Sequence, residues 1–287
     1  MASISYDTTR DSLFHPGLAQ NFFELGSIQN DAMLCAEMSR LAYVKKETDL
    51  ATYLNRQGFQ NDLAIGYDNL GTQVFIASNP TEKLTVVSFR GTEPNDFVDV
   101  LTNGELILTP WPDNSGNSLG QVHQGFAEAL LDNDVLAQVV DCVAPLAKSN
   151  RVLLTGHSLG AALATLTASR VEAEHLYTFG SCRVGNEAFA ESQKNIKHSR
   201  FVDCCDIVTC LPTENFGYVH VGSLNYIDRN GQLLGSPSDT AIKIDRMQAR
   251  IWYLFRFFRS ATLLPRELAD HAQINYLSGV MGLRDQT

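Results

Sequence analysis

In RVLLTGHSLGAALATL, residues 151–166, an apolar run passes into a helical run, with Gly-x-Ser-x-Gly at the junction. Residues 151–155 show no helical period and are typical of a short buried strand. Residues 159–172 are rich in alanine and leucine, which favour a helix. Glycines at the junction permit a tight, strained turn that projects a serine hydroxyl above a sheet. The sequence therefore predicts a nucleophile elbow with Ser158 at its tip.

Strand-like and helix-like runs alternate on both sides of this junction. Residues 30–46 have the apolar spacing of an amphipathic helix, with Asn30 and Asp31 as caps, and residues 125–148 have the pattern of one long helix. Residues 69–72 are a turn signal for an antiparallel hairpin. The alternation predicts an α/β fold, a three-layer sandwich around a mostly parallel central sheet with the hairpin toward one edge. The expected strands are 63–67, 73–77, 84–89, 152–155, 176–179, 201–205 and 219–227.

Composition limits the classes of protein to consider. A chain of 287 residues that is 44% hydrophobic can bury a large core, and without a linker or repeat it is expected to form a single domain, residues 1–287. The net charge of -10 argues against nucleic acid as a partner. No run approaches the roughly 18 apolar residues that a membrane span needs. The first residues lack the pattern of a secretory signal, so we expect a cytoplasmic protein unless a leader was removed.

The six cysteines show neither C-x-x-C spacing nor the density of a disulfide scaffold. Cys204 and Cys205 lie inside an apolar run, where cysteine is usually a small buried hydrophobe. We interpret most of the six as free thiols and expect no metal site. They are Cys35, Cys142, Cys182, Cys204, Cys205 and Cys210.

A serine hydroxyl becomes a nucleophile when a histidine takes its proton and an acid fixes the tautomer of that histidine. In α/β-hydrolases the order along the chain is serine, acid, histidine, and four histidines follow Ser158. We expect His175 and His198 at the surface, and His220 packed or hydrogen-bonded within a strand. His271 follows a proline-containing loop near the chain end, where a late loop can reach over the sheet. His271 is therefore the predicted base.

The acid and the oxyanion donors should lie at strand ends. Asp203 lies within an apolar run, whereas Asp206 comes where that run gives way to a loop, so Asp206 is the predicted acid. One oxyanion donor is the backbone N–H of Leu159, directly after the nucleophile. The segment SFRGT supplies the second, because Gly91 permits close backbone approach and Thr92 offers its N–H and a hydroxyl.

With these residues in place, the chain resembles the class 3 lipases, the fungal-type triacylglycerol lipases. The resemblance implies an α/β-hydrolase fold without a cofactor, a lid among the residues after Thr92, and the same triad and oxyanion hole. Cys182 departs from the family pattern, where proline is usual, and residues 209–210 replace a proline and a basic residue. Residues 1–30 and 232–266 have no clear counterpart in the family. The motifs are VVSFRGT (86–92), VHQGF (122–126), TGHSLGAALATL (155–166), YTFGSCRVGN (177–186), DIVTCLP (206–212), VHVG (219–222) and His271.

The leading functional hypothesis is hydrolysis of ester bonds in acylglycerols through an acyl-serine intermediate, at an oil–water or membrane interface. A phospholipase A1 and a feruloyl or other carboxyl esterase of the same fold are the nearest alternatives. A lipase-like scaffold that binds partners without hydrolysis, as in some plant immune-signalling relatives, is an alternative of a different kind.

Residues 241–265 allow two interpretations. Their apolar residues recur at helical spacing, and additional aromatic and basic residues interleave with them. Such a segment suits a lipid–water interface as an acyl-binding rim or a cover over Ser158, with or instead of residues 93–121, and Trp252 and Phe255 would then contact substrate. It equally suits a helix packed over the core with snorkelling arginines. The predicted stripe consists of Ile244, Met247, Ile251, Leu254 and Phe258.

Overall fold

The computed structural model describes residues 3–19, 22–24, 28–67, 71–91, 106–257 and 264–285. Within these ranges, one central sheet has the strand order β1-β2-β3-β6-β7-β8-β9-β10, and β4 and β5 form a separate ribbon. The strands are β1 (Gln60–Ile65), β2 (Val74–Asn79), β3 (Leu84–Phe89), β4 (Leu108–Pro112), β5 (Ser118–His123), β6 (Arg151–His157), β7 (His175–Phe179), β8 (His198–Asp203), β9 (Ser223–Ile227) and β10 (Leu233–Leu234).

The middle of the sheet is parallel and its edges are antiparallel. Strands β3, β6, β7, β8 and β9 pair in parallel. The β1–β2, β2–β3 and β9–β10 pairs are antiparallel. Phe89 pairs with Gly156, and His157 pairs with Phe179, so neighbouring strands end at the same edge. The predicted mostly parallel sheet with an edge hairpin is confirmed, although residues 68–70 of the turn lie outside the described residues.

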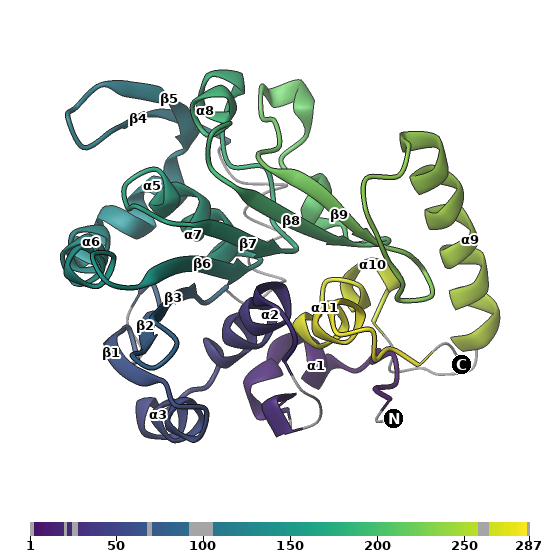
Figure 1. The fold of residues 1–287 in the computed structure, drawn as a ribbon. Helices are drawn as coiled ribbons and strands as arrows, with labels where there is room; N and C mark the ends of the chain where they lie inside the picture. Colours follow the sequence, from purple (N-terminus) through teal and green to yellow (C-terminus); the bar gives the residue numbers. More distant parts are fainter. Residues whose placement is uncertain are drawn as a thin grey trace.

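Helices cover both faces of the sheet and complete the three layers (Figure 1). Helix α2 packs against β3, β6 and β7 on one face, and α11 joins it there; α7 packs against the same three strands from the other face, beside α5. The helices are α1 (Arg10–Phe14), α2 (Asp31–Leu41), α3 (Glu47–Arg56), α5 (Gln124–Leu131), α6 (Val135–Leu146), α7 (Leu159–Ala168), α8 (Glu187–Ser192), α9 (Asp239–Phe257), α10 (Arg266–Ala269) and α11 (Gln273–Val280).

Each face of the sheet has its own hydrophobic core, which explains the uninterrupted apolar strands. Side chains alternate between the faces of a strand. Val87 of β3 therefore packs in the cluster beneath α5, α6 and α7, while Val86 packs in the cluster beneath α2 and α11. Every residue of β2 and β3 is buried. A strand covered on both faces has no polar side, as the run LTVVSF shows.

The bounds of two predicted helices differ from those in the structure. The single helix expected over residues 125–148 is wrong, because α5 ends at Leu131 and α6 begins at Val135. Asn133 and Asp134 between them have φ of 51° and 55°. Asparagine and aspartate tolerate this left-handed region better than other non-glycine residues, so they break the helix. The helix expected over 30–46 is confirmed as α2, which ends earlier, at Leu41.

The predicted surface positions of His175 and His198 are also wrong. His175 begins β7 and is half-buried, whereas His198 begins β8 and is buried. His175 Nε2 lies 2.9 Å from Ser199 Oγ, and His198 Nε2 lies 2.8 Å from Thr178 Oγ1. Each of these bonds gives one ring nitrogen a partner on the neighbouring strand. Strand β8 begins at His198, before the apolar run that marked it in the sequence.

The cysteine predictions agree with the structure, in which all six thiols are free and Cys204 and Cys205 are buried. A helix does form within the segment 241–265, where α9 ends at Phe257, and residues 258–263 lie outside the described part. Helix α9 lies beside the β9–β10 side of the sheet (Figure 1). Among the described residues, no helix has the length and apolar character that a membrane span requires.

Candidate active site

The junction between β6 and α7 is a strained turn. Ser158 has φ of 58° and ψ of -127°, a backbone conformation that is unfavourable for a residue with a Cβ. Its N–H donates to Phe179 O at 3.0 Å, which holds the turn against β7. A Cβ on Gly156 would overlap the carbonyl of Gly160, and one on Gly160 would overlap that of Phe89. The two glycines are therefore required by close backbone packing, as the predicted elbow demands.

Ser158, His271 and Asp206 form one hydrogen-bonded chain. His271 Nε2 lies 2.9 Å from Ser158 Oγ, and His271 Nδ1 lies 2.9 Å from Asp206 Oδ2. All three residues are fully buried. The rejected candidates have other contacts, because Asp203 pairs with Arg284 and His220 Nε2 lies 2.9 Å from Thr209 O. The structure thus brings the three predicted residues together.

Asp206 accepts two further hydrogen bonds. The hydroxyl of Tyr276 donates to Asp206 Oδ2 at 2.5 Å, and the N–H of Val208 donates to Oδ1 at 2.9 Å. Burial raises the pKa of Tyr276 well above its usual value, so the hydroxyl keeps its proton and donates it. Sequence reasoning missed Tyr276. No local motif marks it, since α11 and the loop after β8 meet only in the folded chain.

His157, inside the Gly-His-Ser-Leu-Gly motif, supports the base. Its Nε2 lies 2.8 Å from His271 O, and its Nδ1 lies 2.8 Å from the Tyr43 hydroxyl. Burial lowers the pKa of His157 well below its usual value, so the ring is neutral and carries one N–H. Because a carbonyl only accepts, Nε2–H donates to His271 O, and Nδ1 accepts from Tyr43. Sequence reasoning also missed this pair, which holds the His271 loop in place.

The predicted oxyanion donors are partly described. The N–H of Leu159 belongs to the first turn of α7, where N–H groups have no acceptor within the helix. A Cβ on Gly91 would approach Ser158 Cβ to 3.0 Å, so the chain after β3 passes close to the nucleophile, as predicted. Thr92 lies outside the described residues, and its contribution stays a prediction. The lid expected after Thr92 falls partly in 92–105, also outside them.

Comparison with known proteins agrees with this geometry. Residues 86–216 match the class 3 lipase family. The resemblance predicted from the motifs is confirmed. A lipase of Rhizomucor miehei is 32% identical over 55% of this chain and 46% of its own length. A triacylglycerol lipase of Arabidopsis thaliana is 29% identical over 86% of this chain and 64% of its own length.

The chain therefore spans less than two thirds of either relative. Its architecture is that of a solved mono- and diacylglycerol lipase from Aspergillus oryzae, with a TM-score of 0.59 and 24% identity over 85% of this chain and 87% of that one. This likeness confirms the predicted α/β-hydrolase fold.

Behind the triad, Asp270 anchors the loop that carries His271. Its carboxylate accepts from Tyr6 Oη at 2.5 Å, from Arg266 Nε at 2.9 Å and from the N–H of Cys205 at 2.8 Å. Arg266 and Asp270 are buried. The residue next to the predicted base is thereby tied to the N-terminal segment, to α10 and to the end of β8.

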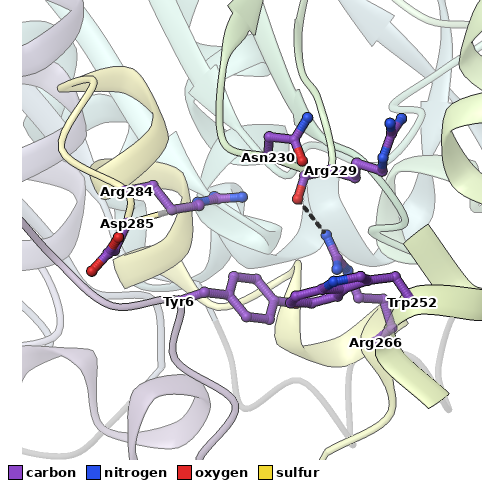
Figure 2. Close-up of a pocket in the computed structure, with 7 residues that line it drawn as sticks. All are labelled: Tyr6, Arg229, Asn230, Trp252, Arg266, Arg284 and Asp285. Atoms are coloured by element: carbon purple, nitrogen blue, oxygen red, sulfur yellow. Dashed lines mark hydrogen bonds between the residues drawn. The ribbon is translucent and has the colours of Figure 1, made fainter. Parts of the chain in front are cut away.

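A small pocket of about 70 Å³ adjoins this anchor, and three arginines line it (Figure 2). Each guanidinium has a carboxylate partner: Arg229 pairs with Asp245, Arg266 with Asp270, and Arg284 with Asp203. Paired charges of this kind hold the surrounding segments together, and the pocket is interpreted as structural. Its lining consists of Tyr6, Arg229, Asn230, Trp252, Arg266, Arg284 and Asp285.

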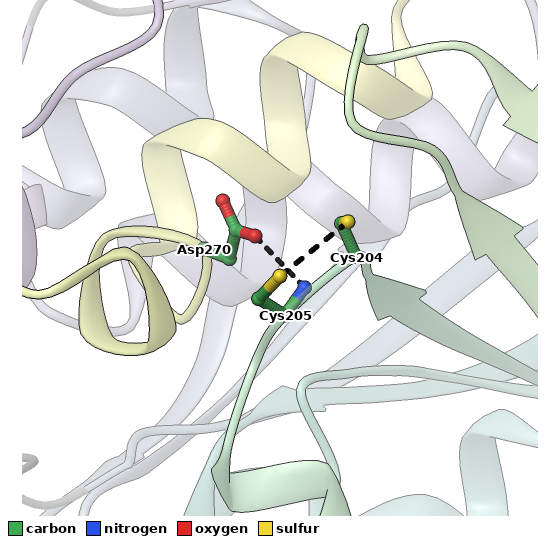
Figure 3. Close-up of side chains that lie close together, drawn as sticks. All are labelled: Cys204, Cys205 and Asp270. Atoms are coloured by element: carbon green, nitrogen blue, oxygen red, sulfur yellow. Dashed lines mark hydrogen bonds between the residues drawn. The ribbon is translucent and has the colours of Figure 1, made fainter. Parts of the chain in front are cut away.

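The sulfur atoms of Cys204 and Cys205 and a carboxylate oxygen of Asp270 lie within 4.8 Å of one another, close enough to be considered as ligands of one metal ion (Figure 3). The Cys204 and Cys205 sulfurs are 3.7 Å apart. The hydrogen bond with Cys205 and burial raise the pKa of the Cys204 thiol well above its usual value, so it keeps its proton. Asp270 is already paired with Arg266. Cys204 Sγ also lies 3.3 Å from Asp245 Oδ2. Two of the three candidate ligands therefore already have partners in the protein, so these residues do not fit a metal ion.

Trp252 and Phe255, the predicted substrate contacts, lie on α9. Phe255 is 85% exposed. Trp252 borders the pocket behind the triad, and the guanidinium carbon of Arg256 lies 5.2 Å from the centre of its ring. Helix α9 reaches the strand ends through Arg246, whose Nε donates to Cys204 O at 2.7 Å. A role of Trp252 and Phe255 in substrate binding stays a prediction.

Proposed function

We propose that this chain hydrolyses carboxylic ester bonds of acylglycerols through an acyl-serine intermediate. The observation that carries the proposal is the unbroken chain of hydrogen bonds from Ser158 Oγ through His271 to Asp206, located at a strained strand-to-helix turn. This arrangement of nucleophile, base and orienting acid is the one that acyl transfer requires. The named relatives, a lipase and a triacylglycerol lipase, support acylglycerols as the substrate class.

The geometry assigns each proton transfer. Asp206 accepts the Nδ1–H of His271, so the lone pair of Nε2 faces Ser158 Oγ and takes its proton as Oγ attacks the ester carbonyl carbon. The electron pair of the carbonyl moves to oxygen, where the N–H of Leu159 and a donor from Thr92 stabilise the oxyanion.

Collapse of this intermediate breaks the bond to the alcohol oxygen, which takes the proton from Nε2 of His271. A water molecule then loses a proton to the same nitrogen and attacks the acyl-serine. The free acid leaves, and Ser158 regains its proton. Asp206 stabilises the imidazolium that forms in both halves of the reaction.

The proposal is tested with Ser158→Ala and a panel of esters. We expect turnover to fall by several orders of magnitude, leaving only the roughly 10³- to 10⁴-fold enhancement over water that the oxyanion donors and substrate binding supply. A fluorophosphonate should label the unaltered protein at Ser158 alone. Ser88→Ala is the matched control, because it removes a buried serine hydroxyl that donates to Met38 O, away from the triad.

The panel contains short and long p-nitrophenyl esters, a triacylglycerol emulsion and phosphatidylcholine. Hydrolysis of phosphatidylcholine in preference to the emulsion would identify a phospholipase. Retained activity in Ser158→Ala, or labelling of another serine, would contradict the assigned nucleophile. A folded protein that hydrolyses no ester and resists the fluorophosphonate would indicate a binding scaffold.

A further inference from the structure

Helix α9 carries apolar residues on two sides, and within the described part of the chain one of these sides packs against the protein. The packed side is a narrow seam of Ile242, Asp245, Ala249 and Tyr253, which are buried or half-buried. At about 100° per residue, these four positions cover a sector of about 80°. Ala249 packs in the small cluster at the end of β8, and the hydroxyl of Tyr253 donates to Leu264 O at 2.5 Å.

The other side points away from the seam. Its residues are centred about 180° around the helix from the seam and span about 100°. Their exposed fractions run from 48% for Ile244 and Ile251 to 85% for Phe255. Exposed apolar residues that occur singly are normal, whereas a contiguous row indicates an interaction surface. We call this row the outer ridge: Ile244, Met247, Ile251, Leu254 and Phe255.

The charge around the outer ridge differs from that of the whole protein. From residue 239 to 257, α9 has four basic residues against two acidic ones, a net charge of +2, whereas the chain as a whole carries -10. Asp245 faces inward and pairs with Arg229. Lys243 and Arg250 lie two turns apart on one flank of the ridge. Arg250 also contacts Glu267 at 2.8 Å. The ridge is thus bordered by cations on an acidic protein.

We propose that the outer ridge of α9 docks on a lipid surface that carries anionic headgroups. The helix, about 28 Å long at 1.5 Å per residue, would lie in the plane of the interface. Its apolar side chains would enter the boundary between headgroups and acyl chains, and Lys243 and Arg250 would meet the headgroup charges. A pattern of an apolar row flanked by lysine and arginine is typical of such helices.

A second copy of the chain fits this surface less well. A stable protein interface usually involves about 20–30 residues on each partner, and the ridge has far fewer. In a symmetric pair of antiparallel helices, the cationic flanks would also lie near each other and repel. A lipid surface has neither difficulty, because its area is unlimited and its charge has the opposite sign.

The packed seam of α9 connects the outer ridge to the segments that carry the triad. The seam of α9 is attached to the loop between β8 and Asp206, where Arg246 Nε donates to Cys204 O and Cys204 Sγ lies 3.3 Å from Asp245. Arg250 reaches Glu267 on α10, a helix that ends two residues before His271. The inference therefore deepens the proposed function and rests on it for the identity of the substrate, while the binding itself is independent of catalysis.

The test measures binding of the Ser158→Ala protein to vesicles by flotation, so that no lipid is consumed. The vesicles contain phosphatidylcholine alone or phosphatidylcholine mixed with phosphatidylserine. Replacing Ile251 and Phe255 together with serine should lower the partition coefficient at least about tenfold. Lys243→Gln should lower binding to the mixed vesicles about fivefold and leave binding to phosphatidylcholine unchanged.

The matched control replaces Leu131 and Phe216 with serine, because both are 58% exposed and lie on other elements. The control should bind as the parent does, and melting temperatures should show that every variant is folded. Equal binding by the ridge variant and its parent, or no binding by the parent, would overturn the proposal. A dimer in sedimentation that the ridge variant abolishes would assign the ridge to a second copy instead.

Hydrolysis of a soluble short-chain ester, measured with Ser158 intact, separates the two proposals. The ridge variant should retain this activity and lose activity on emulsions. Vesicle binding without hydrolysis of any ester would contradict the proposed function alone, whereas hydrolysis without vesicle binding would contradict docking alone.

Discussion

At Asp206, a buried carboxylate accepts hydrogen bonds from three groups: His271 Nδ1, the Tyr276 hydroxyl and the Val208 N–H. The bond from His271 sets the tautomer of this base. The bonds from Tyr276 and Val208 hold the Asp206 carboxylate in the orientation that makes the first bond possible. Hydrogen bonds to a charged group are stronger than those between neutral groups, particularly where water is excluded. Tyr276 is therefore a positioning residue that acts on Ser158 through Asp206 and His271.

Replacing Tyr276 with phenylalanine should lower kcat about tenfold to a hundredfold and change KM little. A hydrogen bond to a charged group contributes about 1.5–3 kcal/mol, and this one supports the imidazolium formed in the transition state. Tyr226→Phe is the control, because that hydroxyl donates to Asp245 at 2.9 Å, outside the triad. An unchanged kcat for Tyr276→Phe, measured on a soluble ester, would contradict the positioning role.

Among the elements, the contact between β3 and α7 controls where the nucleophile sits. Gly160, in the first turn of α7, lies directly against the backbone of Phe89 at the end of β3. A backbone atom cannot move aside as a side chain can. The close approach of this helix to this strand brings the N–H of Leu159 and the backbone of Gly91 close to Ser158.

Gly160→Ala should lower the free energy of unfolding by about 1–3 kcal/mol, because the added methyl group forces α7 away from β3. The rate of ester hydrolysis should fall by more than the fraction of unfolded protein accounts for, because the turn that carries Ser158 moves with α7. Urea unfolding and ester hydrolysis measure the two effects. Gly235→Ala is the control, because a Cβ there meets nothing within 4 Å. A fully stable and active Gly160→Ala variant would show that the contact tolerates a methyl group.

Across the whole molecule, buried neutral histidines make stability depend on pH. Burial lowers the pKa values of His157 and His220 well below normal, and it lowers that of His198 to about 3. In the unfolded chain, each of these histidines titrates near its ordinary pKa of about 6.5. Below that pH, the unfolded chain binds protons that the folded chain does not. Stability is therefore full above pH ~6.5 and is lost as the pH falls toward the folded values.

His198→Gln should make this acid loss shallower. Removal of one such histidine should reduce the slope of the unfolding free energy by about 1.4 kcal/mol per pH unit in the range below pH ~6. Urea unfolding of the parent and the variant across this range measures the two slopes. Parallel curves would mean that His198 is protonated in the folded protein. His15, for which the structure describes no comparable burial, provides the control variant His15→Gln.

Local patterns in the sequence were sufficient for the layered architecture and for the triad. Strand and helix periods identify which runs face a core, and the glycines around Ser158 indicate a turn that few other residues could form. The choice of Asp206 and His271 followed from their places after a strand and near the chain end. Each of these signals is local to its own segment, and the serine–acid–histidine order of α/β-hydrolases joined the three segments into one site.

The tertiary structure decided what depends on distant segments. Tyr276 and the pair of Tyr43 and His157 support the triad only because helices far apart in the sequence pack on the same face. His198 is buried because β8 lies inside the sheet, where Thr178 of the neighbouring strand β7 hydrogen-bonds one nitrogen of its ring. The polar residues around His198 in the sequence give no sign of this position. The apolar period of α9 predicted a helix but not which side packs inward. That choice depends on the shape and charge of the surface that receives the helix, and only the folded chain provides that surface.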